Sequence, residues 1–160
     1  MGAKTEALAR QFEEKGRAAV ATLEKLGDAE WKKVTAPEKW TVGVTAHHLA
    51  GALEVVAGIV TGIVSGGPSR GNFTRAMLDE MNAQHAKEHA HCTREETLAL
   101  FQRGAGKAFA VVQGLSDDQL AKSGTVFTDA PPMTAEQLIM LGLVGHIDDH
   151  MGSIRKTIGM

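Results

Sequence analysis

His146 and His150 stand four residues apart near the end of the sequence, in the segment HIDDHM. On an α-helix, side chains at this spacing lie one above the other, with Cβ atoms about 5–6 Å apart. Both imidazoles can then reach one ion, because nitrogen–zinc bonds are about 2.0–2.1 Å long. Two histidines at this spacing are more often structural or solvated than metal ligands. A metal site therefore requires a further ligand from another element.

The apolar residues around this pair predict which side of the helix is buried. At about 100° per residue, the buried face is formed by Ile139, Leu143, Ile147 and Ile154. His146 and His150 fall at the edge of this face, from where their side chains can project into the interior of a helical bundle. Asp148 points to solvent. Asp149 lies beside the pair, and it either accepts a proton from a ligand imidazole or is an exposed acid.

A second helical segment, TAHHLA, offers His47 and His48 as further ligands. Their side chains differ by about 100° around the helix axis, so they cannot both face the core. Four apolar residues cluster on the side of His48, namely Ala52, Val55, Ile59 and Ile63. We therefore expect His48 to point inward, and His47 to lie on the rim or to be hydrogen-bonded at the surface. Gly51, Gly58 and Gly62 flank the same face. Each lowers the stability of the helix by about 1 kcal/mol relative to alanine, so we expect a compensating reason for them, such as the close approach of another helix.

With the C-terminal pair, His48 makes a set of three imidazole ligands from two helices. Catalytic metal sites use three protein ligands in this way and keep further positions open for water and substrate. Three imidazoles suit several divalent ions, zinc and nickel among them. The sequence thus predicts a metal site at His48, His146 and His150.

The segment HAKEHAHC carries a second group of candidates, His85, His89, His91 and Cys92. They could form another His-x-x-x-His site with a thiolate nearby. No partner cluster of matching spacing is visible elsewhere, so a solvated helix end is the favoured interpretation. His85 has a lesser candidate role, with Asn82, at the mouth of a cleft. For Cys92 the sequence assigns no base that would activate it as a nucleophile.

Helical periodicity dominates the elements that must position these residues. The predicted helices cover residues 8–26, 41–65, 73–89, 93–112, 116–119 and 134–158. Gly27 is the expected stop of the first helix, and Thr93, Ser116 and Thr134 each begin a capping box. The segment TVFT (125–128) is a weak strand candidate. We predict an all-α fold, a four-helix bundle with a short extra helix and long connections, as one domain over residues 1–160.

Length and composition are typical of a soluble globular protein. Of 160 residues, 43% are hydrophobic and 22% charged, and the formal net charge is −2. This charge favours neither nucleic acid nor a membrane as a partner. The most apolar stretch, residues 55–64, is about half the length that a bilayer requires. A single cysteine, Cys92, excludes an internal disulfide and predicts a cytoplasmic protein.

Three segments resemble the DinB-like (DinB/YfiT) superfamily, which includes the N-terminal domains of mycothiol-dependent maleylpyruvate isomerases. They are PEKWTVGVTAHHLA, MNAQHAKEH followed by TREETLALF, and GHIDDHMGSIRK. The family pattern puts the first metal ligand directly before a leucine, which here is His48. The resemblance implies a four-helix bundle that holds one divalent ion, zinc or nickel, through three side chains and that frequently forms homodimers. His47 stands where relatives vary, so it is a candidate for supporting the ligands or lining a substrate pocket.

The resemblance also implies a reaction. Characterised relatives are transferases or isomerases that use low-molecular-weight thiols. Our leading hypothesis is a metal-dependent thiol transferase or hydrolase that acts on a small molecule, with metal-bound water or thiol as the nucleophile. The alternative is a non-catalytic metal-binding or dimerising stress-related bundle. Trp40 either forms a wall of the substrate cleft or anchors the entrance of its helix.

Overall fold

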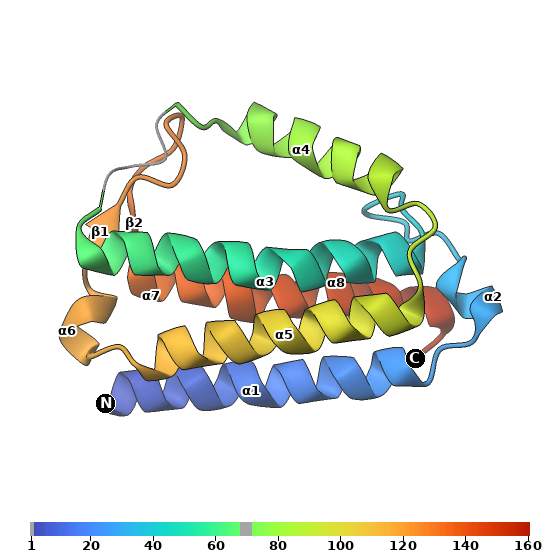
Figure 1. Ribbon diagram of the computed structural model, residues 1–160, viewed down its shortest axis with the longest axis horizontal. Coiled ribbons are helices and arrows are strands. Elements are labelled where there is room, and N and C mark those ends of the chain that lie inside the picture. Colours follow the sequence, from blue (N-terminus) through green and yellow to red (C-terminus); the bar gives the residue numbers. More distant parts are fainter. Residues whose placement is uncertain (1, 68–71) are drawn as a thin grey trace.

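Four long helical stretches lie side by side in the computed structural model, which describes residues 2–67 and 72–160 (Figure 1). Three of them are α1 (Ala3–Glu24), α3 (Val42–Ser65) and α5 (Arg94–Gln113). The fourth is continuous and consists of α7 (Ala135–Leu138), the π-helical segment η1 (Ile139–Val144) and α8 (Gly145–Ile158). α3 packs against α5, η1 and α8. The prediction of an all-α four-helix bundle is confirmed.

A fifth helix, α4 (Arg75–Glu88), lies apart from these stretches, above α3 in Figure 1. It contributes no buried residue to the core, and its main contact with the other elements is with α3. Two single-turn helices, α2 (Asp28–Trp31) and α6 (Asp117–Leu120), lie in the connections. α4 therefore makes few contacts with the rest of the fold. The residues that join it to α3 determine which part of α3 it covers.

The only strand pair in the described residues is β1 (Ser123–Gly124) with β2 (Met133–Thr134), which run antiparallel with Ser123 opposite Thr134. The strand expected at 125–128 is therefore wrong, since the extended pairing lies just before it. The pair joins α6 to α7 and closes the loop between them.

The helix starts follow the capping chemistry expected from the sequence. Thr93, Ser116 and Thr134 each accept a hydrogen bond from the backbone N–H three residues on, and a Glu or Gln side chain returns the bond. Thr41 caps α3 by accepting a hydrogen bond from Val44 N–H, without a side chain that completes a capping box. The first helix ends at Glu24, earlier than expected, because Gly27 instead begins α2, where Glu30 accepts its N–H.

The hydrophobic core is centred on one face of α3. Its fully buried residues include Leu49, Leu53 and Val60, whereas Val55 is 54% exposed. The face chosen from the sequence, which contained Val55, is thus only partly buried. The physical reason is that α3 carries apolar side chains around most of its circumference, so periodicity alone does not distinguish its core face.

Close helix packing does occur, but at a different glycine from those expected. A Cβ added to Gly58 or Gly62 would meet nothing within 4 Å. On α5, in contrast, a Cβ on Gly104 would lie 3.1 Å from the Ala50 carbonyl oxygen and 3.3 Å from Leu53 Cβ. Gly104 therefore sets the short distance between α5 and α3.

The π-helical segment η1 lies directly before the C-terminal histidine pair. π-helical turns widen a helix by one residue and are frequent at functional sites. A Cβ on Gly142 would lie 2.9 Å from Val56 Cγ1, so the widened turn rests closely on α3. The buried face expected for this helix is confirmed, with Ile139, Leu143, Ile147 and Ile154 between 0% and 2% exposed. His146 and His150 lie half-buried at its edge.

Among the described residues, α3 is the one helix whose length and apolar composition would suit a membrane span. The core helix of a soluble protein meets the same criterion. In this fold α3 has helices packed against it from two sides, α5 and α8.

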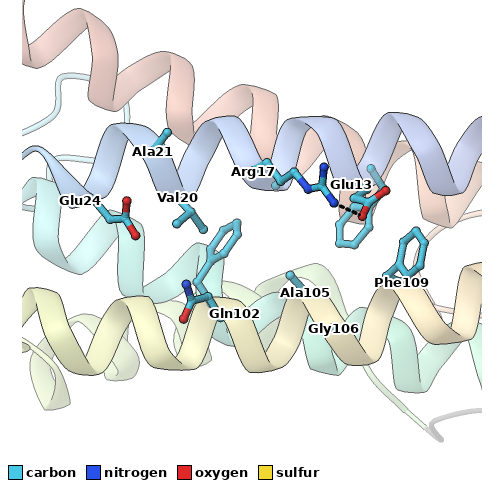
Figure 2. Close-up of a pocket in the computed structure, with 12 residues that line it drawn as sticks. Glu13, Arg17, Val20, Ala21, Glu24, Gln102, Ala105, Gly106 and Phe109 are labelled. Atoms are coloured by element: carbon cyan, nitrogen blue, oxygen red, sulfur yellow. Dashed lines mark hydrogen bonds and ion pairs between the residues drawn. The ribbon is translucent and has the colours of Figure 1, made fainter.

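An open groove of about 390 Å³ runs between α1 and α5 (Figure 2). Apolar side chains line it, among them Phe12, Val20 and Phe109, and an ion pair between Arg17 and Glu13, 2.7 Å apart, lies at its edge. None of the lining residues is a histidine or a cysteine. The groove is therefore separate from the residues singled out for chemistry.

Candidate metal centre

The structure brings His48, His146 and His150 together between α3 and α8. One ring nitrogen of each lies within 4.8 Å of those of the other two. The ring centroid of His48 is 5.2 Å from that of His146 and 5.0 Å from that of His150. Nitrogens bound tetrahedrally to zinc at 2.0–2.1 Å are about 3.3 Å apart. Small side-chain rotations are thus enough to bring the three nitrogens onto one ion.

Burial keeps the imidazoles of His48 and His146 neutral. It lowers the pKa of His48 to about 3, and the neighbouring rings of His150 and His146 add to the effect. Burial also lowers the pKa of His146 to about 4, with a further contribution from His150. A neutral imidazole has one free lone pair, which is the form that binds a metal. His146 Nε2 is moreover buried, with no hydrogen-bond partner among the described residues.

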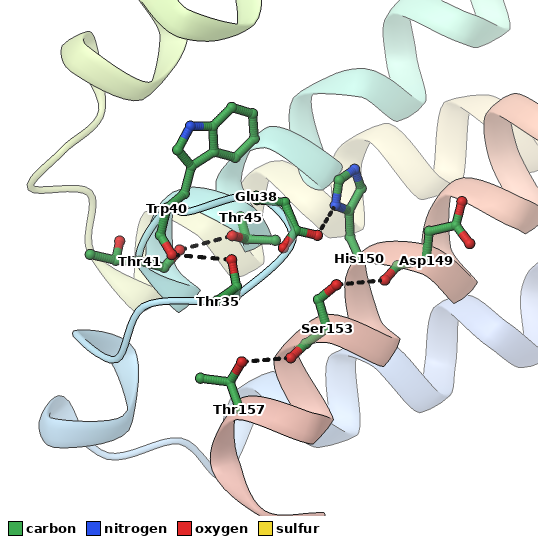
Figure 3. A network of polar contacts seen from close by, with 9 residues as sticks. All are labelled: Thr35, Glu38, Trp40, Thr41, Thr45, Asp149, His150, Ser153 and Thr157. Carbon is green, nitrogen blue, oxygen red and sulfur yellow. Dashed lines mark hydrogen bonds and ion pairs between the residues drawn. The ribbon is translucent and has the colours of Figure 1, made fainter.

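A carboxylate outside the predicted set orients His150. Glu38 Oε1 lies 3.1 Å from His150 Nδ1, and the two side chains are only 10% and 14% exposed (Figure 3). When Nδ1 carries the proton and donates it to Glu38, Nε2 keeps a free lone pair. Ligand histidines in metalloproteins use this arrangement, because the second hydrogen bond fixes the tautomer and the ring orientation.

A tight loop before α3 presents Glu38. Val34 and Thr41 form an isolated antiparallel bridge, and the N–H of Thr35 donates to the Trp40 carbonyl at 2.8 Å. Lys39 takes a left-handed backbone conformation with φ 60°, uncommon for a side-chain-bearing residue. Such conformations persist where the surrounding structure enforces them, and here the turn points Glu38 at α8.

The environment of Glu38 favours its charged form. Burial alone would raise its pKa, but polar contacts with Thr35, Ser153 and His150 outweigh burial and hold the pKa below its usual value. The hydroxyls of Thr35 and Ser153 also donate to backbone carbonyls, at 3.2 and 3.1 Å. Glu38 Oε2 is left buried without a partner among the described residues. His150 is thus one of three polar side chains that contact this carboxylate, and the one whose orientation bears on metal binding.

Asp149, which the sequence offered as the supporting acid, is exposed, and its carboxylate points away from the His150 ring (Figure 3). Sequence reasoning missed Glu38 because it lies 112 positions before His150. A signal was present, since Glu38 is the acid of the PEKW segment just before α3. Nothing in a single sequence tells which of several acids a loop will turn inward.

Trp40 borders the same site. Its ring packs edge-on against His48, with centroids 5.2 Å apart and an interplanar angle of 61°. The side chain is half-buried, so it covers the imidazole on one side while part of the indole faces outward. The interpretation of Trp40 as a wall of the site therefore agrees with its position.

A second histidine cluster forms around His85 and His89, which the sequence offered as a possible metal site but for which a solvated helix end was the favoured interpretation. His47 Nδ1 lies 2.8 Å from His85 Nε2, and the rings of His47 and His89 stack with centroids 4.1 Å apart. One nitrogen of each of the three lies within 4.8 Å of the others. Two expectations are corrected. His47 is only 9% exposed rather than on the rim, and His85 and His89 are half-buried against it, although Lys87 and Glu88 between them are exposed as expected for a solvated helix end.

Other candidates of that segment stay outside both clusters. His91 is exposed, and Asn82 is half-buried on α4. Cys92 is 8% exposed, and burial raises the pKa of its thiol. Trp31 Nε1 donates a hydrogen bond to the Cys92 carbonyl at 2.9 Å. Cys92 is thus a packed structural residue rather than an activated nucleophile.

The chain belongs to the DinB superfamily, whose family model matches residues 11–154. This membership agrees with the resemblance stated from the sequence motifs. No curated protein matches the sequence at a significant level.

Solved structures share the fold at low sequence identity. YfiT from Bacillus subtilis, described as a probable metal-dependent hydrolase with an unusual four-helix bundle topology, is 20% identical, with a TM-score of 0.75 over 99% of this chain and 90% of that one. A mutant of mycothiol-dependent maleylpyruvate isomerase is 10% identical, with a TM-score of 0.76 over 94% of this chain and 60% of that one. The colibactin self-resistance protein ClbS, solved with double-stranded DNA, is 16% identical, with a TM-score of 0.73 over 96% and 94%.

Proposed function

We propose that this protein is a metal-dependent enzyme whose divalent ion, zinc or nickel, is held by His48, His146 and His150. The observation that carries the proposal is the convergence of three half-buried imidazoles, one of which has a buried nitrogen with no partner among the described residues. Neutral nitrogen donors of this kind match ions of intermediate softness. Three ligands leave positions for water and substrate, as in catalytic sites.

The residues around the ligands have separable tasks in this proposal. Glu38 accepts the Nδ1–H of His150 and so directs Nε2 toward the ion. Trp40 covers one side of His48 and limits the access of water. A bound divalent ion would act as a Lewis acid and lower the pKa of a coordinated water or thiol, which supplies a nucleophile near neutral pH.

We assign the reaction to thiol transfer or hydrolysis on a small molecule. Support comes from two structural relatives, one named a mycothiol-dependent isomerase and the other described as a probable metal-dependent hydrolase. A low-molecular-weight thiol is the co-substrate that the first relative suggests. Although ClbS was solved with DNA, the net charge of −2 favours a small molecule here. We also propose that the protein is cytoplasmic and forms a homodimer.

Turnover by the metal-loaded protein tests this assignment. The zinc- and nickel-loaded forms are incubated with glutathione and an electrophilic acceptor, and separately with small esters and amides. We expect thiol consumption or hydrolysis that is lost with a chelator and in His146→Ala, and retained in His91→Ala, whose histidine is exposed and outside the site.

Each outcome of this assay has a clear meaning. Conjugation without hydrolysis identifies a transferase, and hydrolysis without conjugation identifies a hydrolase. If the loaded protein binds metal through the triad and turns over neither class of substrate, the enzymatic proposal is wrong. The non-catalytic metal-binding bundle would then be the correct interpretation.

A further inference from the structure

We propose that His47, His85 and His89 form a second metal site, separate from the first, which fastens α4 onto α3. His47 is on α3, His85 is on α4, and His89 is the residue that ends α4. The two histidine clusters share no residue. Each can therefore hold its own ion, and the second site stands or falls independently of the proposed function.

The nitrogens of the second cluster lie as close together as those of the first, although its rings are more nearly parallel. Its three ligand nitrogens lie within the same limit of 4.8 Å. The ring centroids of His47, His85 and His89 are 5.0 Å, 4.1 Å and 4.7 Å apart for the three pairs in turn (His47–His85, His47–His89, His85–His89). Nitrogens around a tetrahedral zinc ion are about 3.3 Å apart, so these nitrogens are within reach of one ion once the stacked rings of His47 and His89 turn their lone pairs toward it.

A hydrogen-bonded histidine cluster without metal is the competing interpretation, and it leaves one buried nitrogen of the cluster without a partner among the described residues. A neutral imidazole has one N–H and one lone pair. The contact between His47 Nδ1 and His85 Nε2, at 2.8 Å, uses one N–H and one lone pair. His85 Nδ1 is buried and has no hydrogen-bond partner among the described residues. Buried polar atoms without partners are rare in native proteins, and a bound ion would use the lone pairs that converge here.

A metal ion in the second site would also add bonds between α4 and α3, which otherwise make few contacts. α4 buries no residue, and Met77 and Met81 on it are 41% and 54% exposed. Beyond its own turns, its described hydrogen bonds are one from Arg75 N–H to Asp129, 3.2 Å long, and the contact between His85 and His47. A helix held by so few apolar contacts opens easily. Bonds from His85, His89 and His47 to one metal ion would hold the C-terminal end of α4 against α3.

This end of α4 lies beside the first cluster. His47 and His48 are adjacent on α3, and the ring centroids of His48 and His85 are 5.7 Å apart. An ion in the second site would therefore keep α4 in place next to His48. Loss of that ion would release α4 and widen access to the first site.

Zinc titration of the full-length chain tests the second site. Metal-free wild type, His89→Ala, His89→Gln, His48→Ala and the control His91→Ala are dialysed against Zn²⁺, and bound metal per chain is measured. Circular dichroism checks that each variant is folded. Hydrogen exchange of residues 75–88 reports how firmly α4 is held.

We expect two bound zinc ions per chain in wild type and His91→Ala, and one in each of the other variants. The exchange of α4 should slow at least tenfold with zinc in wild type and His48→Ala, but not in the His89 variants.

The two sites give distinguishable failures. If wild type binds one ion that is lost in His48→Ala and kept in both His89 variants, the second site is refuted and the first stands. If the one ion is lost in the His89 variants and kept in His48→Ala, the second site stands and the proposed function loses its metal. Unchanged exchange of α4 on addition of zinc would refute the fastening of α4.

Discussion

Glu38 and His150 are 112 positions apart in the sequence, yet Glu38 Oε1 lies 3.1 Å from His150 Nδ1. Both side chains are nearly buried, so the contact is little screened by solvent. It fixes which nitrogen of His150 is free. The loop before α3, which carries Glu38, and α8, which carries His150, therefore together position one ligand of the candidate metal site.

Glu38→Gln keeps the size of the side chain and removes its charge. We expect zinc affinity at the first site to fall by about 10-fold or more, because the carboxylate fixes the tautomer and ring orientation of His150. Competition with a chromophoric chelator measures the change. The matched control is Asp149→Asn, which alters an exposed acid beside the same histidine and should leave the affinity unchanged. Equal affinities in wild type and Glu38→Gln would refute the role given to Glu38.

The stability of the metal-free protein should fall as the pH drops from 7 to 5. In the unfolded chain, His48 and His146 take up protons near pH 6.5, but in the folded chain their pKa values are about 3 and about 4. The unfolded state then binds more protons, which lowers the free energy of unfolding by at most about 1.4 kcal/mol per pH unit for each imidazole. Urea unfolding in the presence of a chelator measures this slope.

Substitution of His48 by leucine provides the comparison for the pH series. It removes one buried imidazole, so we expect a shallower decline between pH 7 and 5 than in wild type. His91→Ala removes an exposed histidine and should keep the wild-type slope. A stability that stays constant or rises as the pH falls would contradict the low pKa values.

Two glycines on α5 should respond oppositely to alanine. A Cβ on Gly104 would press on the backbone of α3, 3.1 Å from the Ala50 carbonyl oxygen, and we expect a loss of about 1–3 kcal/mol. A Cβ on Gly106 meets nothing within 4 Å, so Gly106→Ala should gain up to about 1 kcal/mol from helix propensity. Thermal and urea unfolding measure both. If the two variants are equally stable, α5 and α3 are not as close as described.

Cys92 should be slow to react. Burial raises the pKa of its thiol, so less thiolate is present near neutral pH than for a free cysteine. We expect alkylation by iodoacetamide at pH 7.5 to be roughly tenfold or more slower in the folded protein than in urea. Mass spectrometry follows the reaction. A folded-state rate equal to that in urea would identify Cys92 as an accessible thiol and reopen its candidacy as a nucleophile.

Sequence reasoning was most successful where the determinants are local. The capping residues Thr93, Ser116 and Thr134 predicted helix starts, because a cap acts within three residues of its partner. The apolar face of the last helix was correct for a similar reason. The π-helical segment η1 was not expected, since its widened turn depends on packing against Val56 of α3.

The candidate site shows the same division. His146 and His150 share a helix, so their spacing alone predicted that their side chains would lie together. His85 and His89 also share this spacing, but their neighbour His47 belongs to another helix. Whether α4 lies over α3 depends on the long connections at its two ends, and a sequence pattern contains no information on that placement. Glu38 was missed for the same reason.

The measurement that tests the central claim most directly is an anomalous-scattering crystal structure of the zinc-soaked protein, collected on both sides of the zinc absorption edge. We predict an anomalous peak bonded to His48, His146 and His150 at about 2.0–2.1 Å from each ligand nitrogen, with the Glu38–His150 hydrogen bond intact. Three well-ordered imidazoles with no anomalous density between them, at zinc concentrations that saturate the protein in solution, would contradict the account.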